Sequence, residues 1–508
     1  MTVVVGIDIG TTSAKAGAFD PGAREVGATE VAYPLLEPEH GRAVQDPQVV
    51  VDAVVAATRG AVAGARAAGL PIAGLSCSSA MHSLIALDAH DRPLTPLITW
   101  ADQRAAPQAE RLRAEHPDLH RRTGVPLHPM TPLTKLVWFR EEAPDVAARA
   151  RRWCGIKELV LHRLAGAWVT DHSIASATGL LNLARLDWDA EALELAGVRR
   201  EQLCDLVPTT HALTLTDRAA AELGLAGGAV PLVVGAGDGP LANLGVGAVE
   251  PGVAACSIGT SGALRVVVER PGVDERGRLF CYALVPGRWI VGGAISNGGA
   301  VLQWAGEALA PELGPHHERE LLALAAAAPA GSDGLLMLPY LLSERAPHWS
   351  TLARGAYVGL TRAHRREHLV RAALEGVCQQ LALLLGSVRD AGHEVTDVRA
   401  TGGFARSTLW RQMLCDALGL AVGFPAGHQG SGLGAALLGM DALGVVDGLA
   451  RAAELVRIDE IRRPDPAAAA VYAAMLPTFD ALYDALEPAF RALRRLDGTA
   501  HPQPPARA

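Results

Sequence analysis

Cysteine is scarce in this sequence, and its few copies are scattered along the chain. The seven cysteines occupy positions 77, 154, 204, 256, 281, 378 and 415. Their number is odd and no two of them form a CxxC pair, which fits neither a disulfide framework nor a zinc site. We therefore expect reduced thiols in a cytoplasmic protein.

The sequence also lacks a long uninterrupted hydrophobic run and a dense basic run. The least charged stretch, residues 223–249, contains Asp238 and is broken by glycine and proline, so we expect no membrane partner. The N-terminal residues MTVVVGIDIG lack the basic region of a signal peptide and are typical of a strand. The formal net charge of -8 argues against nucleic acids as partners, because they attract clustered lysine and arginine.

What the 508 residues do contain is the composition of a globular enzyme, with 49% hydrophobic and 20% charged residues. The length predicts more than one domain. Strand-like and helix-like segments alternate throughout, which indicates the α/β class. We predict strands at 3–9, 15–19, 72–76, 84–87, 232–236 and 253–258, helices at 47–68, 365–390 and 407–418, and a mostly helical region at 110–164.

Two short segments repeat one pattern, about half a chain apart. IDIGTTSAK at 7–15 and CSIGTSGAL at 256–264 each read as a strand, a Gly-Thr-hydroxyl turn and a returning strand. Such a turn offers free backbone N–H groups and hydroxyls, which suit a phosphate. Either turn alone could be an ordinary hairpin connection. Together they favour phosphate binding, with a triphosphate clamped between two similar domains.

Two aspartates lie near the ends of predicted strands, each close to a glycine. Asp8 lies inside an apolar strand, where a carboxylate is costly unless it is paired or bound to a cation. Mg²⁺ held through water would satisfy it, and hydrogen bonds from turn amides are the alternative. Asp238, in VVGAGDGP, is our candidate for the base that accepts a hydroxyl proton in phosphoryl transfer. Its alternative is a helix N-cap. Lys15 does not belong to a GxxxxGK[ST] loop and has no assigned role.

Further strand ends carry residues suited to sugars and nucleotides. Trp100 and Asp102 would lie on one face of an extended segment, an apolar wall beside a hydroxyl acceptor. His82 closes another strand end and could donate to a hydroxyl or carboxylate, although a lone His or Trp is usually structural. Gly402 and Gly403 follow a predicted strand and permit close approach of a ligand, or serve only packing.

Several long motifs resemble those of the FGGY carbohydrate kinases, across roughly residues 3–490. MTPLTKLVWFREE at 130–142 resembles one family signature. TGGFARSTLWRQMLCDALGLAV at 401–422, closing with GLGAALLG at 432–439, resembles a second. The resemblance implies a two-domain, actin-like (ribonuclease-H-like) ATPase fold with the active site in the interdomain cleft.

The resemblance also implies a division of the chain. We expect a substrate-binding N-terminal domain at 1–242 and a nucleotide-binding C-terminal domain at 243–496. The proline-rich, polar tail at 497–508 should be disordered. A homodimer is the assembly that the family favours.

Within the family, the stretches SSAMHSLIALD, RPLTPLITWADQR, RRTGVPLHPM, RLFCYAL and SERAPHW are most similar to the gluconate kinases. The resemblance implies ATP-dependent phosphorylation of D-gluconate to 6-phospho-D-gluconate. A kinase for another sugar or polyol, such as D-xylulose, is the first alternative. A non-catalytic sugar sensor and an actin-like nucleotide hydrolase are the others. The presence of Asp8 and Asp238 argues against a sensor, and the motifs around Met81 and Trp100 argue against a hydrolase.

The same resemblance implies roles for single residues, with ATP and Mg²⁺ as cofactors. Asp8 matches the acid linked to the cation, and Asp238 matches the general base. Sugar contacts are implied for Met81, His82, Trp100 and Asp102, to which we add Arg104, a candidate for the substrate carboxylate, and Asn297. Nucleotide contacts are implied for Gly10, Thr11, Thr12, Gly259, Thr260, Gly299, Gln303, Gly402 and Gly403. The segment PAGHQGS at 425–431 departs from the family, whose members usually carry a glutamate there.

Overall fold

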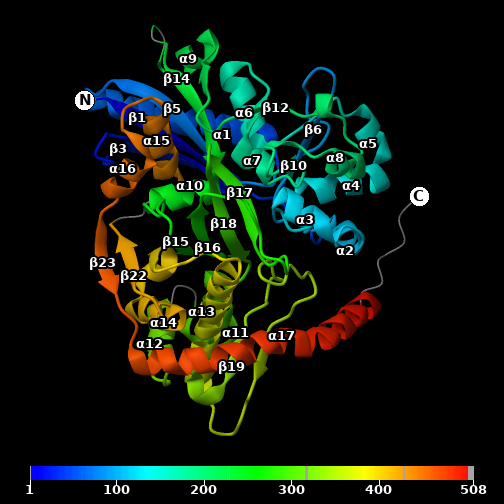
Figure 1. The fold of residues 1–508 in the computed structure, drawn as a ribbon, viewed down its shortest axis with the longest axis vertical. Coiled ribbons are helices and arrows are strands. Elements are labelled where there is room, and N and C mark those ends of the chain that lie inside the picture. The colour runs from blue at the N-terminus through cyan, green and yellow to red at the C-terminus, as the bar shows by residue number, and fades with distance from the viewer. Residues whose placement is uncertain (1, 226, 228, 315–317, 427–429, 501–508) are drawn as a thin grey trace. The chain divides into compact units, whose positions relative to one another are not determined.

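The computed structural model describes the whole chain except residues 1, 226, 228, 315–317, 427–429 and 501–508 (Figure 1). The α/β class predicted from the sequence is confirmed. The chain forms two compact units whose segments interleave along the sequence. Unit 1 comprises Met1–Ala255, Arg265–Gly292 and Pro425–Asp459, and unit 2 comprises Cys256–Leu264, Gly293–Phe424 and Glu460–Ala508.

Unit 1 is built on a six-stranded sheet with the order β13-β14-β5-β1-β2-β3. β1 and β14 both run parallel to β5 between them, whereas β2 and β3 continue the sheet in antiparallel hairpins. In the register, Ile9 of β1 and Gly237 of β14 both pair with Ser79 of β5. The carboxyl ends of these three strands therefore lie in one row. The strands are β1 (Val3–Ile9), β2 (Ser13–Phe19), β3 (Glu25–Ala32), β5 (Ile72–Ser79), β13 (Ala212–Thr214) and β14 (Pro231–Gly237).

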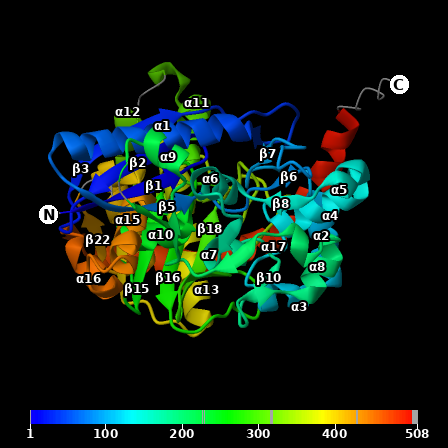
Figure 2. The same ribbon diagram turned by 90° about the horizontal axis from the view of Figure 1, so that it is seen from above.

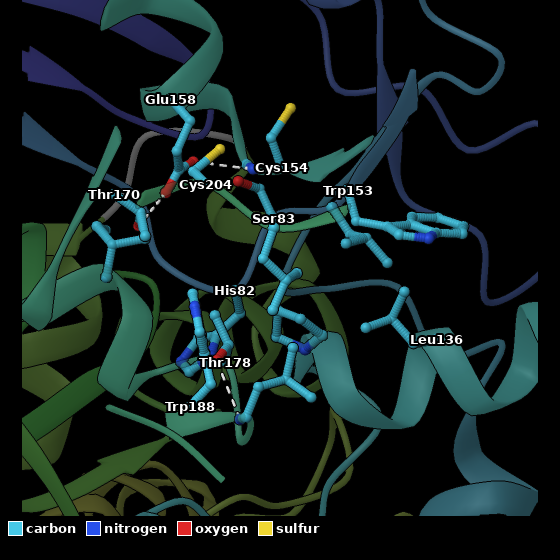
Figure 3. A pocket seen from close by; sticks show the side chains of 16 residues that line it. His82, Ser83, Leu136, Trp153, Cys154, Glu158, Thr170, Thr178, Trp188 and Cys204 are labelled. Atoms are coloured by element: carbon cyan, nitrogen blue, oxygen red, sulfur yellow. Dashed lines mark hydrogen bonds between the residues drawn. The ribbon is translucent and has the colours of Figure 1, made fainter. Parts of the chain in front are cut away.

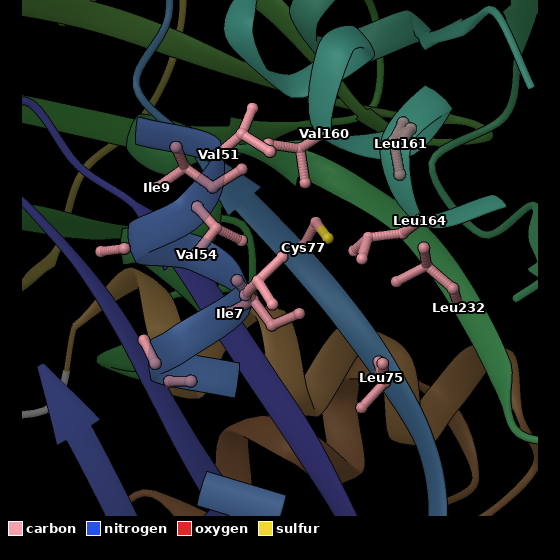
Figure 4. Close-up of a cluster of buried hydrophobic side chains, with 14 of the residues drawn as sticks. Ile7, Ile9, Val51, Val54, Leu75, Cys77, Val160, Leu161, Leu164 and Leu232 are labelled. Atoms are coloured by element: carbon pink, nitrogen blue, oxygen red, sulfur yellow. The ribbon is translucent and has the colours of Figure 1, made fainter. Parts of the chain in front are cut away.

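Helices cover both faces of this sheet. α1 (Pro47–Ala67) lies on one face, and α10 (Asp238–Gly245) and α15 (Ser431–Ala442) lie on the other (Figure 2). The Asp46 carboxylate caps α1 by accepting from the Gln48 N–H at 2.8 Å, and proline follows it at the first position. Between α1 and the strands, aliphatic side chains form a dry core (Figure 4).

The rest of unit 1 is a lobe of short helices around a second apolar cluster. Four of its helices, α2 to α5, carry proline at the first or second position, where a missing N–H costs nothing. The helices of the lobe are α2 (Ala106–Glu115), α3 (Pro117–Thr123), α4 (Pro132–Glu142), α5 (Pro144–Arg149), α7 (His172–Ser176), α8 (Ala190–Ala196) and η1 (Arg200–Gln202). Of the other helices of unit 1, α6 (Ile156–Ala165) and α9 (Asp217–Glu222) pack on the first core, and α16 (Gly448–Leu455) packs on α15. The short strands are β4 (Val44–Gln45), β6 (Ile85–Leu87), β7 (Leu97–Ile98), β8 (Arg152–Cys154), β9 (Val169–Asp171), β10 (Leu181–Asn182), β11 (Asp187–Trp188) and β12 (Asp205–Val207).

The second large sheet has seven strands in the order β17-β18-β16-β15-β21-β22-β23. Its strands are β15 (Val253–Ile258), β16 (Gly262–Val268), β17 (Phe280–Val285), β18 (Arg288–Ile295), β21 (Asp397–Thr401), β22 (Val422–Pro425) and β23 (Ile458–Arg462). Unit 2 adds a hairpin of β19 (Leu336–Leu338) and β20 (Ala356–Val358). Its helices are α11 (Gly299–Leu309), η2 (Pro311–Leu313), α12 (Glu318–Ala326), η3 (Ser332–Gly334), α13 (Arg366–Asp390), η4 (Gly403–Arg406), α14 (Thr408–Leu418) and α17 (Pro466–Ala500).

Two helices, α1 and α13, are long and apolar enough to cross a membrane by length and composition alone. The most apolar window of α13 is 83% buried and that of α1 is 56% buried. This burial is typical of the core helices of a globular protein, and the membrane-free expectation stays a prediction.

The predicted elements mostly agree with the observed ones. The strands at 3–9 and 253–258 are confirmed to the residue, and the helix predicted at 47–68 ends one residue earlier. The returning strand predicted from Lys15 begins at Ser13. α17 continues to Ala500, so the remainder of the predicted disordered tail lies outside the described residues. The proposed boundary at 242 stays a prediction.

Glycines let α15 pack directly on its neighbours. A Cβ on Gly434 would lie 1.9 Å from the Leu241 carbonyl oxygen of α10, and one on Gly6 would lie 2.0 Å from the Gly432 carbonyl oxygen. Both obstacles are backbone atoms, which cannot turn aside. This close packing fixes the position of α10, the helix that follows β14.

We expect Gly434→Ala to lower the free energy of unfolding by about 3 kcal/mol, the upper range for overpacking, because α10 and α15 must separate. Thermal unfolding and urea titration would measure the loss. Gly386→Ala is the matched control, since Gly386 lies in α13 with no atom within 4 Å of the added Cβ. That control should be neutral or more stable, and equal stability of the two variants would contradict the packing argument.

Candidate functional site

The row of strand ends in unit 1 opens into a pocket. The turn after β1 and the loop after β5 line it together with the segment around Trp100. The Trp100 Nε1–H donates to the Thr11 hydroxyl at 2.9 Å, and Gln45 Nε2 donates to the Thr11 carbonyl at 2.7 Å. The lining residues are Gly10, Thr11, Gln45, Val50, Ala80, Met81, Ser83, Leu97, Thr99, Trp100 and Ile156. Four predicted site residues, Gly10, Thr11, Met81 and Trp100, are thus brought together.

The third strand end, that of β14, also reaches Met81. A Cβ on Gly237 would lie 2.8 Å from the Met81 side chain. Asp238 follows directly as the first residue of α10, with Gly237 as the N-cap residue. Its Oδ1 accepts from the Gly239 N–H at 2.7 Å. Asp238 is half-buried at the N-terminal end of α10, where the positive end of the helix dipole lies.

A buried ion pair fixes the end of β14. Lys157 Nζ lies 2.7 Å from Asp171 Oδ2 and donates to the Ala236 carbonyl at 3.1 Å. The Gly237 N–H donates to the Ser173 hydroxyl at 3.2 Å. Sequence reasoning missed this pair, although a lysine and an aspartate inside the apolar run IKELVLHRLAGAWVTD were a visible signal.

Asp8 lies at the end of β1 and is half-buried. Its Oδ1 accepts from the Ser78 hydroxyl at 2.9 Å, and Ser431 also bonds to it. Burial raises the pKa of Asp8, while these hydrogen bonds and the charge of Lys15 oppose the rise. Among the described residues there is no cluster of three or more His, Cys, Asp or Glu side chains that could hold a metal ion. A single carboxylate fits Mg²⁺, which keeps several waters and takes further oxygens from phosphates. Thr12, the exposed tip of the turn, does not line the pocket.

The His82 side chain is already engaged by protein groups. Its Nδ1 lies 2.8 Å from the Ala177 carbonyl oxygen, and its Nε2 lies 3.4 Å from the Tyr282 hydroxyl. Its backbone has a φ of 66° in the left-handed region, which turns the loop after β5. Tyr282, within the RLFCYAL motif, was not predicted as a site residue.

A separate cavity of about 40 Å³ borders His82 in unit 1 (Figure 3). Its lining is mostly apolar, with Trp153, Trp188 and two buried cysteines. Of its polar side chains, Thr170 donates to Glu158 at 2.5 Å. Burial raises the pKa of Glu158, and that hydrogen bond opposes the rise.

The Asp102 side chain is engaged by neighbouring protein groups. Its fully buried carboxylate accepts from the Ala43 N–H at 2.9 Å and from the Arg104 N–H, Nε and Nη2 at 3.0, 2.7 and 2.8 Å. Although burial opposes it, these bonds hold the pKa of Asp102 below its usual range. Asp102 thus holds Arg104, and its predicted contact with a sugar stays a prediction. Arg104 is itself only 9% exposed and stacks over the Trp138 ring at 5.1 Å.

The Asn297 side chain is likewise engaged by protein groups. Its side chain is fully buried in unit 2, where Nδ2 donates to the Ser343 carbonyl at 2.7 Å and to Glu344 Oε2 at 2.9 Å. Its Oδ1 accepts from the Leu342 N–H at 2.9 Å. With these atoms engaged, Asn297 anchors the loop before α11, and its predicted contact with a substrate stays a prediction.

Unit 2 contains a second, larger pocket of about 490 Å³. Five predicted nucleotide contacts line it: Gly259, Thr260, Gly299, Gln303 and Gly403. The Gly299 N–H donates to the Gly259 carbonyl at 2.6 Å, which joins the second Gly-Thr turn to the start of α11. The volume and the exposed glycine backbones suit a nucleotide. Sequence reasoning missed Phe404, Arg406 and Trp410, which also line the pocket and lie within the second signature.

Gly402 supports this pocket from behind. Its φ of 117° is one that residues with side chains avoid, and a Cβ there would lie 2.2 Å from the Ile258 carbonyl oxygen. Gly403 differs, because the nearest atom to its added Cβ is the flexible Arg406 Nη2 at 3.6 Å. A side chain at Gly402 would therefore strain the backbone, whereas one at Gly403 would add atoms to the lining of the pocket.

We expect Gly402→Ala to weaken MgADP binding by about tenfold or more, because β21 and β15 must shift to admit the methyl group. Isothermal titration calorimetry of each variant would measure the dissociation constant. Gly386→Ala is the control, because Gly386 lies in α13 of the same unit and does not line the pocket, and this variant should keep the affinity. Equal affinities in both variants would contradict the proposed support of the pocket by Gly402.

Comparisons with known proteins place the chain in a family. Residues 3–245 match the N-terminal domain, and residues 254–443 the C-terminal domain, of the FGGY family of carbohydrate kinases. The gluconokinase of Bacillus subtilis (strain 168) is 41% identical over 496 residues, which cover 95% of this chain and 96% of that protein.

Two solved structures are similar at the level of the fold. Gluconate kinase from Lactobacillus acidophilus has a TM-score of 0.91 at 33% identity, covering 97% of this chain and 99% of that one. Ligand-bound xylulose kinase from the same species has a TM-score of 0.92 at 33% identity, covering 97% and 100%. These likenesses confirm the two-domain, actin-like ATPase fold that the sequence motifs implied. The chain is a sugar kinase and belongs to the FGGY family of carbohydrate kinases.

Proposed function

We propose that this protein is a gluconokinase, which transfers the γ-phosphoryl group of ATP to the primary hydroxyl of D-gluconate. The observation that carries the proposal is the pocket in unit 1, where Thr11, Met81 and Trp100 meet beside the strand that ends at Asp238. The choice of D-gluconate as the substrate is supported by the 41% identity to a protein named gluconokinase. The likeness to a xylulose kinase structure keeps D-xylulose as the second candidate.

The chain's own residues suggest how the transfer proceeds. The Trp100 ring offers an apolar face for the sugar carbons, and its Nε1–H orients the Thr11 hydroxyl. Asp238 accepts the proton of the attacking hydroxyl as the new oxygen–phosphorus bond forms and the bond to ADP breaks. Glycine amides of the pocket in unit 2 hold the phosphates. Mg²⁺, when bound, neutralises charge on the phosphates, and Asp8 is the residue that would hold it through water.

The proposed function also bears on the location, the partners and the assembly of the protein. A metabolic kinase with reduced thiols suits the cytoplasm. Its partners would be ATP and the sugar acid, without nucleic acid or membrane, and its assembly a homodimer.

The acceptor is tested by ADP release from purified protein with MgATP across D-gluconate, D-xylulose, glycerol, L-ribulose and no acceptor. We expect the highest kcat/KM with D-gluconate. Preference for D-xylulose would overturn the acceptor while retaining the kinase, and release without any acceptor would contradict transfer to a sugar.

We expect Asp238→Asn to lower kcat by about 10²-fold or more, because the amide cannot take the hydroxyl proton. The KM for ATP should change little. Asp217→Asn is the matched control, since Asp217 is also the first residue of a helix, α9, but is exposed. A folded Asp238→Asn enzyme with near-normal kcat would remove Asp238 from the role of base.

A further inference from the structure

Lysine is almost absent from this sequence. Lysine and arginine together number 46, and only three of them are lysines, at positions 15, 135 and 157. Lys135 and Lys157 are buried, with 0% and 1% exposure, whereas Lys15 is exposed. Arginine supplies nearly every other cation, so the two buried lysines mark places where a compact ammonium fits and a flat guanidinium does not.

Lys135 lies on α4 and binds three backbone carbonyls at once. Its Nζ donates to the His82 oxygen at 2.7 Å, the Thr99 oxygen at 2.8 Å and the Met130 oxygen at 2.7 Å. A protonated ammonium has three N–H donors, so each donor has one acceptor. Among the described residues, no carboxylate lies within ion-pair distance of Lys135. The charge is therefore stabilised by backbone dipoles from three separate segments.

Two of these segments form the wall of the pocket in unit 1. His82 follows Met81 in the loop after β5, and Thr99 directly precedes Trp100. Met81, Thr99 and Trp100 line the pocket itself. One ammonium thus joins the loop that carries Met81 to the segment that carries Trp100. Among the described residues, the strand pairing between these two segments is limited to the bridge between Leu84 and Ile98.

We propose that Lys135 is a positioning residue, whose ammonium holds the Met81 and Trp100 walls at the spacing that the sugar requires. The proposal rests on the proposed function only for the identity of the sugar. Lys135 does not line the pocket, so it acts through the three carbonyls. Its loss should weaken acceptor binding and leave the pocket in unit 2 unaffected.

The proton on Lys135 is held weakly enough to matter near neutral pH. Burial lowers the pKa of Lys135 to about 7, with Asp102 opposing the shift and Arg104 adding to it. His82 and His128 are the other titratable groups on the segments that pack against it. A neutral amine has two N–H groups for three carbonyls. The acceptor KM should therefore rise as pH increases through 7.

The first test is the pH profile of the acceptor KM, measured from pH 6 to pH 9 with the best acceptor. In the wild type we expect a rise of about tenfold, equivalent to one charge-assisted hydrogen bond, with a flat KM for ATP. Lys135→Arg should have a raised acceptor KM without this pH dependence, because a guanidinium stays charged throughout. Arg163→Met is the control for loss of a cation in unit 1, because Arg163 pairs with Glu222 away from the pocket, and it should keep the dependence.

A second readout does not need catalysis. Hydrogen exchange of Lys135→Met should be faster than wild type at residues 80–84 and 97–104 and unchanged at the turn 258–262 in unit 2. Unchanged exchange in the first two segments would overturn the proposal, as would a wild-type acceptor KM that does not change with pH. It is also overturned if the acceptor KM of Lys135→Arg depends on pH as that of the wild type does, because the titrating group would then be a histidine. Absence of turnover with every acceptor would contradict the proposed function, and the exchange result would still decide the role of Lys135.

Discussion

The parallel alignment of β1, β5 and β14 is the constraint on which the candidate site depends. Because Ile9 and Gly237 both pair with Ser79, three chain segments leave the sheet at the same row. The next residues are the Gly-Thr turn, the Met81 loop and Asp238. A shift of one residue in either ladder would turn alternate side chains to the other face and move one of these groups away from the rest. The apolar core between α1 and the sheet specifies the register, since it buries every second residue.

Buried charges next to the site hold the segments that leave these strands. Lys157 and Asp171 fix the end of β14, Lys135 joins two pocket walls, and Asp102 holds Arg104. Each buried charge carries a desolvation cost that a hydrophobic side chain would avoid. Their hydrogen bonds end on backbone carbonyls and amides of loops that an apolar core could not orient. These buried charges therefore lower the stability of the fold somewhat, and they fix the positions of the loops.

The sequence predicted those parts of the site that depend on local pattern. The Gly-Thr turns, the strand before Asp238 and the strand before Gly402 were visible as apolar runs broken by glycine. The hydrogen bonds of Asp102 and Asn297 to protein groups were not predicted, because burial and hydrogen-bond saturation arise only in the folded chain. Lys135 lies within the first signature, but its role could not be predicted because its three acceptors lie up to 53 residues away along the chain.

The scarcity of lysine has a practical consequence for handling the protein. Reagents that acylate amines react with exposed neutral amino groups, and Lys135 and Lys157 are shielded inside the fold. Apart from the chain's amino terminus, Lys15 is then the one lysine that such a reagent can reach. Lys15 lies on β2, paired in register with Asp8 of β1. A dye or a surface tether attached through an amine would therefore sit at one known place, close to the turn at Gly10, Thr11 and Thr12.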